Sequence, residues 1–222
     1  MKKAIFPLIA LLTITGCSDK PDLRKDISDF ISHFSLAESM EAYKSGGYVS
    51  TRVDTTGEKA LKTVIELEYS RLDKDHPTYV EVTTNYEDDV ETSKVEVRFV
   101  ESEGSYYIST NGELKPSSLK ECDNLITKFF YKEVGIDGNY HTQGFYYGDY
   151  LKVVAPVLQK WVTIDQLNEL YIYDISVTKV IDGLETTVSE NYSINKLGMA
   201  VENHNYVGNE TGYIEQDIYI HN

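Results

Sequence analysis

The sequence contains few of the residues from which catalytic and metal sites are usually built. It has two cysteines, five histidines and one tryptophan in 222 residues. No two histidines lie two or four positions apart, as a local metal site requires, and neither an HExxH nor a CxxC motif occurs. No Gly-x-Ser-x-Gly elbow or phosphate-binding glycine loop is present either. We therefore expect no enzyme, no cofactor and no metal ion. The histidines are His33, His76, His141, His204 and His221.

Basic residues are also in short supply. The chain has 21 lysines and arginines against 36 acidic residues, a formal net charge of −15. A surface this acidic is repelled by phosphate, which makes nucleic acid a poor partner and disfavours broad adhesion to anionic lipid head groups. Some acids gather in two turns that could bind calcium weakly, but their spacing fits no EF-hand loop, so we interpret them as solvated turns. These acids are Asp73, Asp75, Glu87, Asp88 and Asp89.

Long apolar runs are missing apart from one short run at the N-terminus. Lys2 and Lys3 precede the apolar stretch from Ala4 to Ile14, and Gly16 then leads into Cys17. This order is typical of a secretory signal, and the run is too short to span a bilayer as a helix. The Thr-Gly-Cys ending resembles the lipobox of bacterial lipoproteins, in which the cysteine is acylated and becomes the new N-terminus.

The lipobox divides the chain into three parts. We predict a signal peptide over residues 1–16, a lipidated Cys17 with a short tether over 17–22, and a single domain over 23–222. Loss of the signal removes two lysines and no acid, which leaves 19 basic against 36 acidic residues, a charge of −17. The tether reaches at most ~20 Å when extended, so the domain is expected outside the cytoplasm and close to the membrane that holds the anchor. This is the cell membrane or, if one is present, the outer membrane.

The second cysteine, Cys122, has no partner for an intramolecular disulfide once Cys17 is modified. An exported domain without a disulfide must be stabilised by its own core. Cys122 lies among the apolar residues Leu119, Leu125 and Phe129 at helical spacing. We therefore interpret it as a buried thiol and not as a nucleophile.

Apolar periodicity predicts helices and strands in separate blocks. One helix is predicted from about Asp22 to Lys44, ended by Gly46-Gly47. Alternating strands with polar turns between them follow, typical of an antiparallel meander with one face in the core. In the second strand, Val80 and Val82 are expected to face the core. The predicted strands are Leu61 to Arg71, Val80 to Tyr86, Val95 to Phe99, Tyr171 to Val180, Thr186 to Ile194, Met199 to Val207 and Tyr213 to Ile220.

The middle of the chain is predicted to be helical. One helix begins after Ser118, and a second stretch begins at Asp149 and is kinked or ended by Pro156. A short turn is predicted over 164–170. The order of helix, strands, helices and strands predicts an α+β domain with helices against one side of an antiparallel sheet.

This layout resembles a known family. The lipobox, the N-terminal helix, the long sheet interrupted by helices, and the block from Tyr192 to Gly198 resemble the LolA/LppX-like bacterial lipoproteins. The resemblance implies a curved, half-open β-barrel with helices packed against its concave side. It also implies an apolar space that carries lipid or acyl chains. Because this chain is predicted to be anchored, local sensing, storage or transfer is easier to envisage than free shuttling.

Tyrosine is unusually frequent, with 18 residues against seven phenylalanines. Its ring is apolar and its tip polar, which suits surfaces that are half buried and half wet. One aromatic cluster lies on and beside an irregular central loop, where it could line an apolar cavity, stack on sugar rings or simply pack helices on the sheet. The cluster is Tyr140, Phe145, Tyr146, Tyr147, Tyr150 and Trp161.

These observations leave three functional hypotheses. The first is an anchored binding protein for a hydrophobic or amphipathic ligand, such as a lipid or acyl chain, held by apolar burial without catalysis. The second is a surface module that binds an envelope protein or glycan through an acidic, tyrosine-rich exterior. The third is an accessory role in a membrane complex. For the first, the candidate ligand-binding residues are Phe129, Phe130, Tyr146, Tyr147, Val154 and Trp161.

Overall fold

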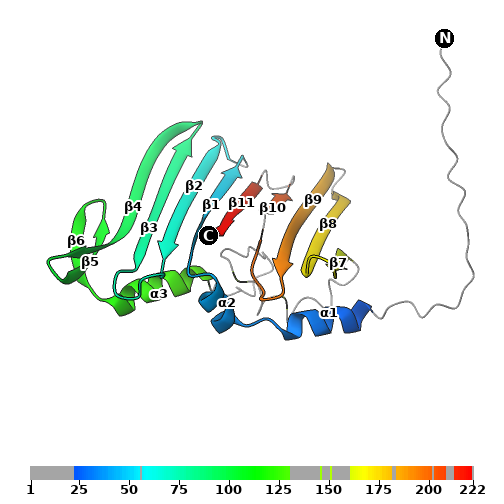
Figure 1. Ribbon diagram of the computed structural model, residues 1–222. Coiled ribbons are helices and arrows are strands. Elements are labelled where there is room, and N and C mark those ends of the chain that lie inside the picture. The colour runs from blue at the N-terminus through cyan, green and yellow to red at the C-terminus, as the bar shows by residue number, and fades with distance from the viewer. Residues whose placement is uncertain are drawn as a thin grey trace, which may run out of the picture.

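The computed structural model describes residues 23–55, 57–130, 146, 151, 161–181, 184–201, 203–208 and 213–221. Eleven antiparallel strands form one sheet in the order β6-β5-β4-β3-β2-β1-β11-β10-β9-β8-β7 (Figure 1). The strands are β1 (Ser45–Asp54), β2 (Leu61–Ser70), β3 (Thr78–Glu87), β4 (Val90–Ser102), β5 (Ser105–Thr110), β6 (Glu113–Ser117), β7 (Val162–Asp165), β8 (Leu170–Ile181), β9 (Leu184–Asn195), β10 (Asn203–Gly208) and β11 (Tyr213–His221).

The sheet is curved and is not closed into a barrel, with β6 and β7 at its two ends. The first strand, β1, pairs with the last, β11, in the middle of the sheet. Three helices, α1 (Leu23–Ser32), α2 (Leu36–Ala42) and α3 (Leu119–Phe130), lie along one edge, beneath the ends of the strands (Figure 1). The predicted α+β fold with a half-open, barrel-like sheet is therefore confirmed.

The N-terminal helical segment differs from the prediction of one helix from Asp22 to Lys44. The structure has α1 and α2, separated by a break at which Ser35 caps the second helix. The hydroxyl oxygen of Ser35 accepts a hydrogen bond from the Glu38 backbone N–H at 3.3 Å. Serine at this position satisfies an amide that a continuous helix would bond internally, so it favours a new helix start.

The glycine pair that was expected to end this helix instead begins β1. A Cβ atom on Gly47 would lie 2.3 Å from the carbonyl oxygen of Leu67 on β2. No side chain larger than hydrogen fits at that distance, so glycine allows the close approach of β1 and β2. Strand β1 was not predicted, because a glycine pair after a helical apolar pattern also indicates the end of a helix.

Other boundaries also differ. Strands β5 and β6 were not predicted, and the segment predicted as a turn over 164–170 contains the end of β7 and then the turn into β8. The strand predicted from Met199 begins as isolated bridges, and β10 starts only at Asn203. The helix after Ser118 is confirmed as α3. The helical stretch predicted from Asp149 to Trp161 lies almost wholly outside the described residues.

We call the face of the sheet that carries the buried aromatic residues the inner face. Helix α3 packs on the inner face through Phe130, whose ring centroid lies 5.4 Å from that of Tyr69. Helix α1 packs on it through Phe30, whose ring centroid lies 6.4 Å from that of Tyr171. On β3, the strand register places Tyr79 on the inner face, so Val80 and Val82 lie on the outer face. The prediction that these valines face the core is therefore wrong.

Candidate functional site

The inner face has an apolar zone near the helices. Its residues are at most 9% exposed and most are tyrosines: Tyr48, Leu67, Tyr69, Tyr79, Phe99, Tyr171, Tyr173, Tyr192, Ile194 and Tyr219. Two ring pairs are stacked across neighbouring strands. Tyr173 and Tyr192 have centroids 4.7 Å apart, and Tyr48 and Tyr219 have centroids 6.3 Å apart. Such cross-strand aromatic pairs stabilise the sheet and present ring surface to whatever lies against it.

Burial keeps the phenols of the apolar zone protonated. Desolvation raises the pKa of Tyr173 to about 12 and raises the pKa of Tyr48, Tyr69 and Tyr171 further. The Tyr69 hydroxyl donates to the Tyr43 carbonyl at 3.0 Å, whereas the buried Tyr171 hydroxyl has no hydrogen-bond partner in the described part of the chain. The zone is therefore apolar in its rings and uncharged in its polar tips.

A polar zone adjoins the apolar zone further along the central strands. It consists of Ser50 and Arg52 on β1 and Glu215 and Asp217 on β11. The register pairs Ser50 with Asp217 one alternation step beyond the Tyr48–Tyr219 pair, and Arg52 with Glu215 one step further. Ser50, Glu215 and Asp217 are completely buried. Charged groups in such an environment need partners, because removal from water costs several kcal/mol per ion.

Arg52 provides the positive charge of the polar zone. Its Nε atom lies 3.5 Å from Glu215 Oε1, and its side chain remains 24% exposed. Within the described part of the chain, neither Arg52 Nη2 nor the Ser50 hydroxyl, both buried, has a hydrogen-bond partner. A buried donor left without an acceptor costs about 1–3 kcal/mol. The polar zone therefore contains buried donors that are unsatisfied within the described part of the chain.

Three of the six predicted ligand-binding residues have side chains that the structure describes. Phe130 is fully buried against Tyr69, and Tyr146 is 8% exposed. The backbone N–H of Tyr146 donates to the carbonyl of Phe130 at 3.2 Å, so these two residues lie together. Trp161 is half-buried and packs against the same core. The side chain of Phe129 in α3, and all of Tyr147 and Val154, lie outside what the structure describes.

Cys122 lies on the buried face of α3 and is completely inaccessible. Burial raises the pKa of its thiol to about 11, with a smaller contribution from the neighbouring Asp123 carboxylate. The thiolate is therefore rare at neutral pH. These observations support the interpretation of Cys122 as a structural residue.

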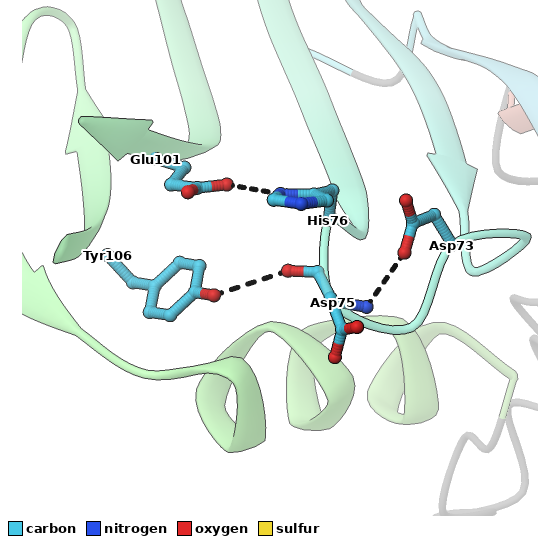
Figure 2. Close-up of polar contacts among 5 residues, drawn as sticks. All are labelled: Asp73, Asp75, His76, Glu101 and Tyr106. Atoms are coloured by element: carbon cyan, nitrogen blue, oxygen red, sulfur yellow. Dashed lines mark hydrogen bonds and ion pairs between the residues drawn. The ribbon is translucent and has the colours of Figure 1, made fainter. Parts of the chain in front are cut away.

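The two acidic turns lie at opposite ends of β3. This strand runs from Thr78 to Glu87, a length of about 30 Å. The turn that carries Asp73 and Asp75 therefore cannot share ligands with the one that carries Asp88. Figure 2 shows how the first turn is held: Asp73 Oδ1 accepts from the Asp75 N–H at 2.9 Å, and Tyr106 Oη donates to the Asp75 carbonyl at 3.2 Å.

Sequence reasoning missed all four residues of the polar zone. Strand β1 was not recognised, so Ser50 and Arg52 had no assigned face. On β11, the acids alternate with Ile214 and Ile218, a pattern that would normally place the isoleucines inside. The structure reverses this arrangement, with Ile214 46% and Ile218 44% exposed and both acids buried. Only the pairing of β11 with β1 reveals the zone.

Comparisons with known proteins give distant structural similarities. No protein-family model matches the chain, and no curated protein matches it. A DUF1329 family protein from Desulfovibrio piger has 9% identity and a TM-score of 0.26, over 89% of this chain and 91% of that one. A structure described as a candidate outer membrane lipoprotein-sorting protein domain from Vibrio parahaemolyticus has 5% identity and a TM-score of 0.22, over 87% and 91%.

A third structure, the β-barrel-like protein of a domain of unknown function, DUF1849, from Brucella abortus, has 7% identity and a TM-score of 0.18, over 81% of this chain and 98% of that one. With scores this low, none of these structures assigns the chain to a family or a function. Within the described part of the chain, none of the helices has the length and apolar character that crossing a membrane would require.

Proposed function

We propose that this chain is an extracytoplasmic lipoprotein, anchored by acyl chains on Cys17, that binds an amphipathic ligand on the inner face of its sheet without catalysis. The observation that carries the proposal is the direct junction between the apolar zone and the polar zone. A single alternation step along β1 leads from the buried ring of Tyr48 to the buried hydroxyl of Ser50. A lipid has the same arrangement, in which an apolar chain is joined directly to a polar head group.

The two zones suggest how such a ligand would lie. Its chain would contact the tyrosine rings, where burial contributes about 25 cal/mol per Å² of apolar surface. Its head would accept hydrogen bonds from Ser50 and Arg52, the donors that have no described partner. An anionic head beside Arg52 would also lie near the carboxylates of Glu215 and Asp217. We therefore propose an uncharged, hydroxyl- or ester-bearing head group.

The candidate residues from the sequence fit the chain-binding part of this proposal. Phe130, Tyr146 and Trp161 lie in or against the core that continues the apolar zone. Their contacts also serve helix and sheet packing, so a ligand would share these rings with the core. Phe129, Tyr147 and Val154 are proposed to contact the chain of the ligand on the basis of the sequence pattern alone.

Retention of a ligand through purification tests the proposed binding. The full-length chain would be extracted from membranes in a mild detergent, examined by native mass spectrometry, and then extracted with solvent for lipid analysis. We expect a defined lipid on the wild-type protein and at least tenfold less on the Ser50→Ala/Arg52→Met variant. The control is Thr51→Ala/Arg98→Met, which removes a hydroxyl and a guanidinium from the outer face and should retain the lipid.

Two outcomes would contradict the binding proposal. One is a ligand-free mass that stays unchanged after incubation with membrane extract. The other is equal lipid retention by the inner-face variant and its control. The anchor is tested separately by Cys17→Ser, which should move the protein from the membrane fraction to the soluble fraction. Recovery of this variant in the membrane fraction would count against acylation at Cys17.

The alternative of an interaction module has less support. It depends on a tyrosine-rich exterior, yet none of the twelve tyrosines whose exposure the structure describes is exposed. The tyrosines of this part of the chain lie mostly on the inner face. A ligand-free protein in the experiment above would make capture of an envelope protein or glycan the next measurement.

A further inference from the structure

A hollow lies at the helical edge of the sheet, and none of its lining residues belongs to either zone. It has a volume of about 430 Å³ and is formed by the end of α2, the turn between β2 and β3, and the start of α3. Four of its residues are cations: Lys44, Arg71, Lys74 and Lys120. We call this hollow the basic cleft.

The basic cleft has a surplus of positive charge. Two of its cations are paired with its two acids: Lys44 Nζ lies 2.6 Å from Glu41 Oε1, and Arg71 Nη2 lies 2.9 Å from Asp123 Oδ1. Lys74 and Lys120 are exposed and form no ion pair with an acid of the described chain. The cleft therefore carries two uncompensated positive charges, in a protein whose net charge is −15.

Electrostatic effects within the cleft agree with this geometry. The pKa of Glu41 is lowered chiefly by its bond to Lys44, with further contributions from Lys74 and Arg71. Cations from two separate segments of the chain therefore act on the same carboxylate, that of Glu41. An anion that enters the cleft would be attracted by Lys74 and Lys120, which both line it, and phosphate is an anion that lysine commonly binds.

The floor of the basic cleft is apolar. Met40, Pro77 and Leu119 line it, and Met40 and Leu119 also pack against the hydrophobic core. A site for a simple inorganic anion needs no such surface. Charge above an apolar floor instead suits the boundary between a lipid head group and the start of its chains.

The position of the cleft also suits a membrane surface. It lies among α2, α3 and the adjoining turn, on the same edge of the sheet as α1 (Figure 1). Helix α1 begins at Leu23, six positions after Cys17. If Cys17 holds the anchor, the extended tether keeps this edge within ~20 Å of the membrane.

We propose that the basic cleft binds the phosphate of an anionic phospholipid head group in the membrane that holds the anchored chain. This inference rests on the proposed anchor at Cys17, but it concerns a different site from the inner face. A bound head group would orient the domain on the membrane with its helical edge towards the lipid. The overall acidity of the chain does not oppose this, because screening limits the reach of surface charges to about 8–10 Å.

The test is a lipid titration followed by native mass spectrometry. The full-length chain in mild detergent would be titrated with dioleoyl phosphatidylglycerol, or with dioleoyl phosphatidylcholine as the zwitterionic comparison. We expect the Lys74→Glu/Lys120→Glu variant to bind phosphatidylglycerol at least about tenfold more weakly than the wild type. The control Lys59→Glu/Lys94→Glu has the same change of charge away from the helical edge and should stay within about twofold of wild type.

Several results would overturn the proposal. Equal weakening by both double variants would mean that binding depends only on the net charge of the protein. Equal binding of the two lipids would mean that the cleft does not distinguish an anionic head group from a zwitterionic one. Displacement of phosphatidylglycerol by 10 mM inorganic phosphate, with retention of phosphate in the cleft, would identify a soluble anion as the ligand. Matching thermal unfolding midpoints of the variants would show that the substitutions leave the fold intact.

The same spectra separate this inference from the proposed function. The cleft variant should lose exchangeable phosphatidylglycerol but keep the lipid that survives purification on the inner face. If the inner-face proposal fails, the retained lipid is missing while the titration of the cleft is unaffected.

Discussion

The apolar zone and the polar zone share strands β1 and β11 and the same face of the sheet, yet they differ in the groups that they bury. In the apolar zone, rings stack on rings and α3 inserts Phe130 against Tyr69. In the polar zone, Ser50, Glu215 and Asp217 are buried beside the partly exposed Arg52. Burial of rings is favourable, whereas burial of charged groups costs free energy unless they are paired. The stability of the inner face is therefore expected to come mainly from the apolar zone.

The largest effect on stability is expected in the apolar zone. Phe130→Ala should lower the free energy of unfolding by about 3–5 kcal/mol, because it leaves a cavity beneath Tyr69 in a fully buried site. Denaturant unfolding followed by tyrosine fluorescence measures this change. Leu167→Ala, at a site that is 90% exposed, is the control and should change it by less than about 0.5 kcal/mol. Similar values for both variants would mean that this end of the inner face is not the packed core described here.

The alkylation rate of Cys122 reports how well α3 excludes water from the apolar zone. Because burial raises the pKa of its thiol from 9.0 to about 11, the thiolate fraction at pH 8 should be about 100-fold lower than that of an ordinary cysteine, and alkylation correspondingly slower. Iodoacetamide labelling followed by mass spectrometry checks this, with the protein in guanidinium chloride as the reactive reference. Rapid labelling of the native protein would show that α3 does not seal the apolar zone.

A smaller stability effect is expected in the polar zone. Glu215→Leu should lower the free energy of unfolding by about 2 kcal/mol, less than for a fully buried pair because Arg52 is 24% exposed. Addition of Arg52→Met should recover at least half of that loss, since the double variant no longer leaves a cation beside an apolar group. Strictly additive losses in a double-mutant cycle would contradict a direct coupling of Arg52 and Glu215.

The smallest effect is expected outside both zones, at the exposed pair of His76 and Glu101 (Figure 2). Their atoms Nδ1 and Oε2 lie 2.5 Å apart, and this hydrogen bond and the carboxylate charge raise the pKa of His76 above 6.5. A raised histidine pKa gives stability that is fully present below pH 6.5 and is lost as the pH rises through the folded-state value. Thermal unfolding at pH 5.5 and 8.5 should therefore show a small fall for the wild type.

Glu101→Gln should reduce that fall and return the His76 pKa, followed by NMR, towards 6.5. An unchanged His76 titration in this variant would contradict the pairing. Because the pair lies at the surface, its removal should leave both the apolar zone and lipid retention unaffected.

Much of the fold could be predicted from apolar periodicity. Alternation correctly located β2, β4, β8 and β9, because in antiparallel sheets each strand has one buried face. Periodicity does not say which face is buried, however. On β3 and β11 the aliphatic residues lie outside, and the inner face carries Tyr79 and Glu215 instead.

The polar zone and the basic cleft could not be predicted for a related reason. Arg52 and Glu215 are 163 positions apart and meet only because β1 pairs with β11. The cleft brings together Lys44, Lys74 and Lys120 from three separate elements. In the sequence, each of these residues is an isolated charge in an acidic chain. The lipobox-like motif at Cys17, by contrast, is local in sequence, and the acylation of Cys17 stays a prediction.

The measurement that tests the binding of an amphipathic ligand most directly is photo-crosslinking in the native membrane. Benzoylphenylalanine would be placed at Thr63, which faces Arg52 from β2 on the inner face, or at Val64, the next residue, which lies on the outer face. Mass spectrometry would then identify the adducts. We expect a lipid adduct at position 63 and none at position 64. Protein adducts at position 64, with no lipid at position 63, would contradict the account.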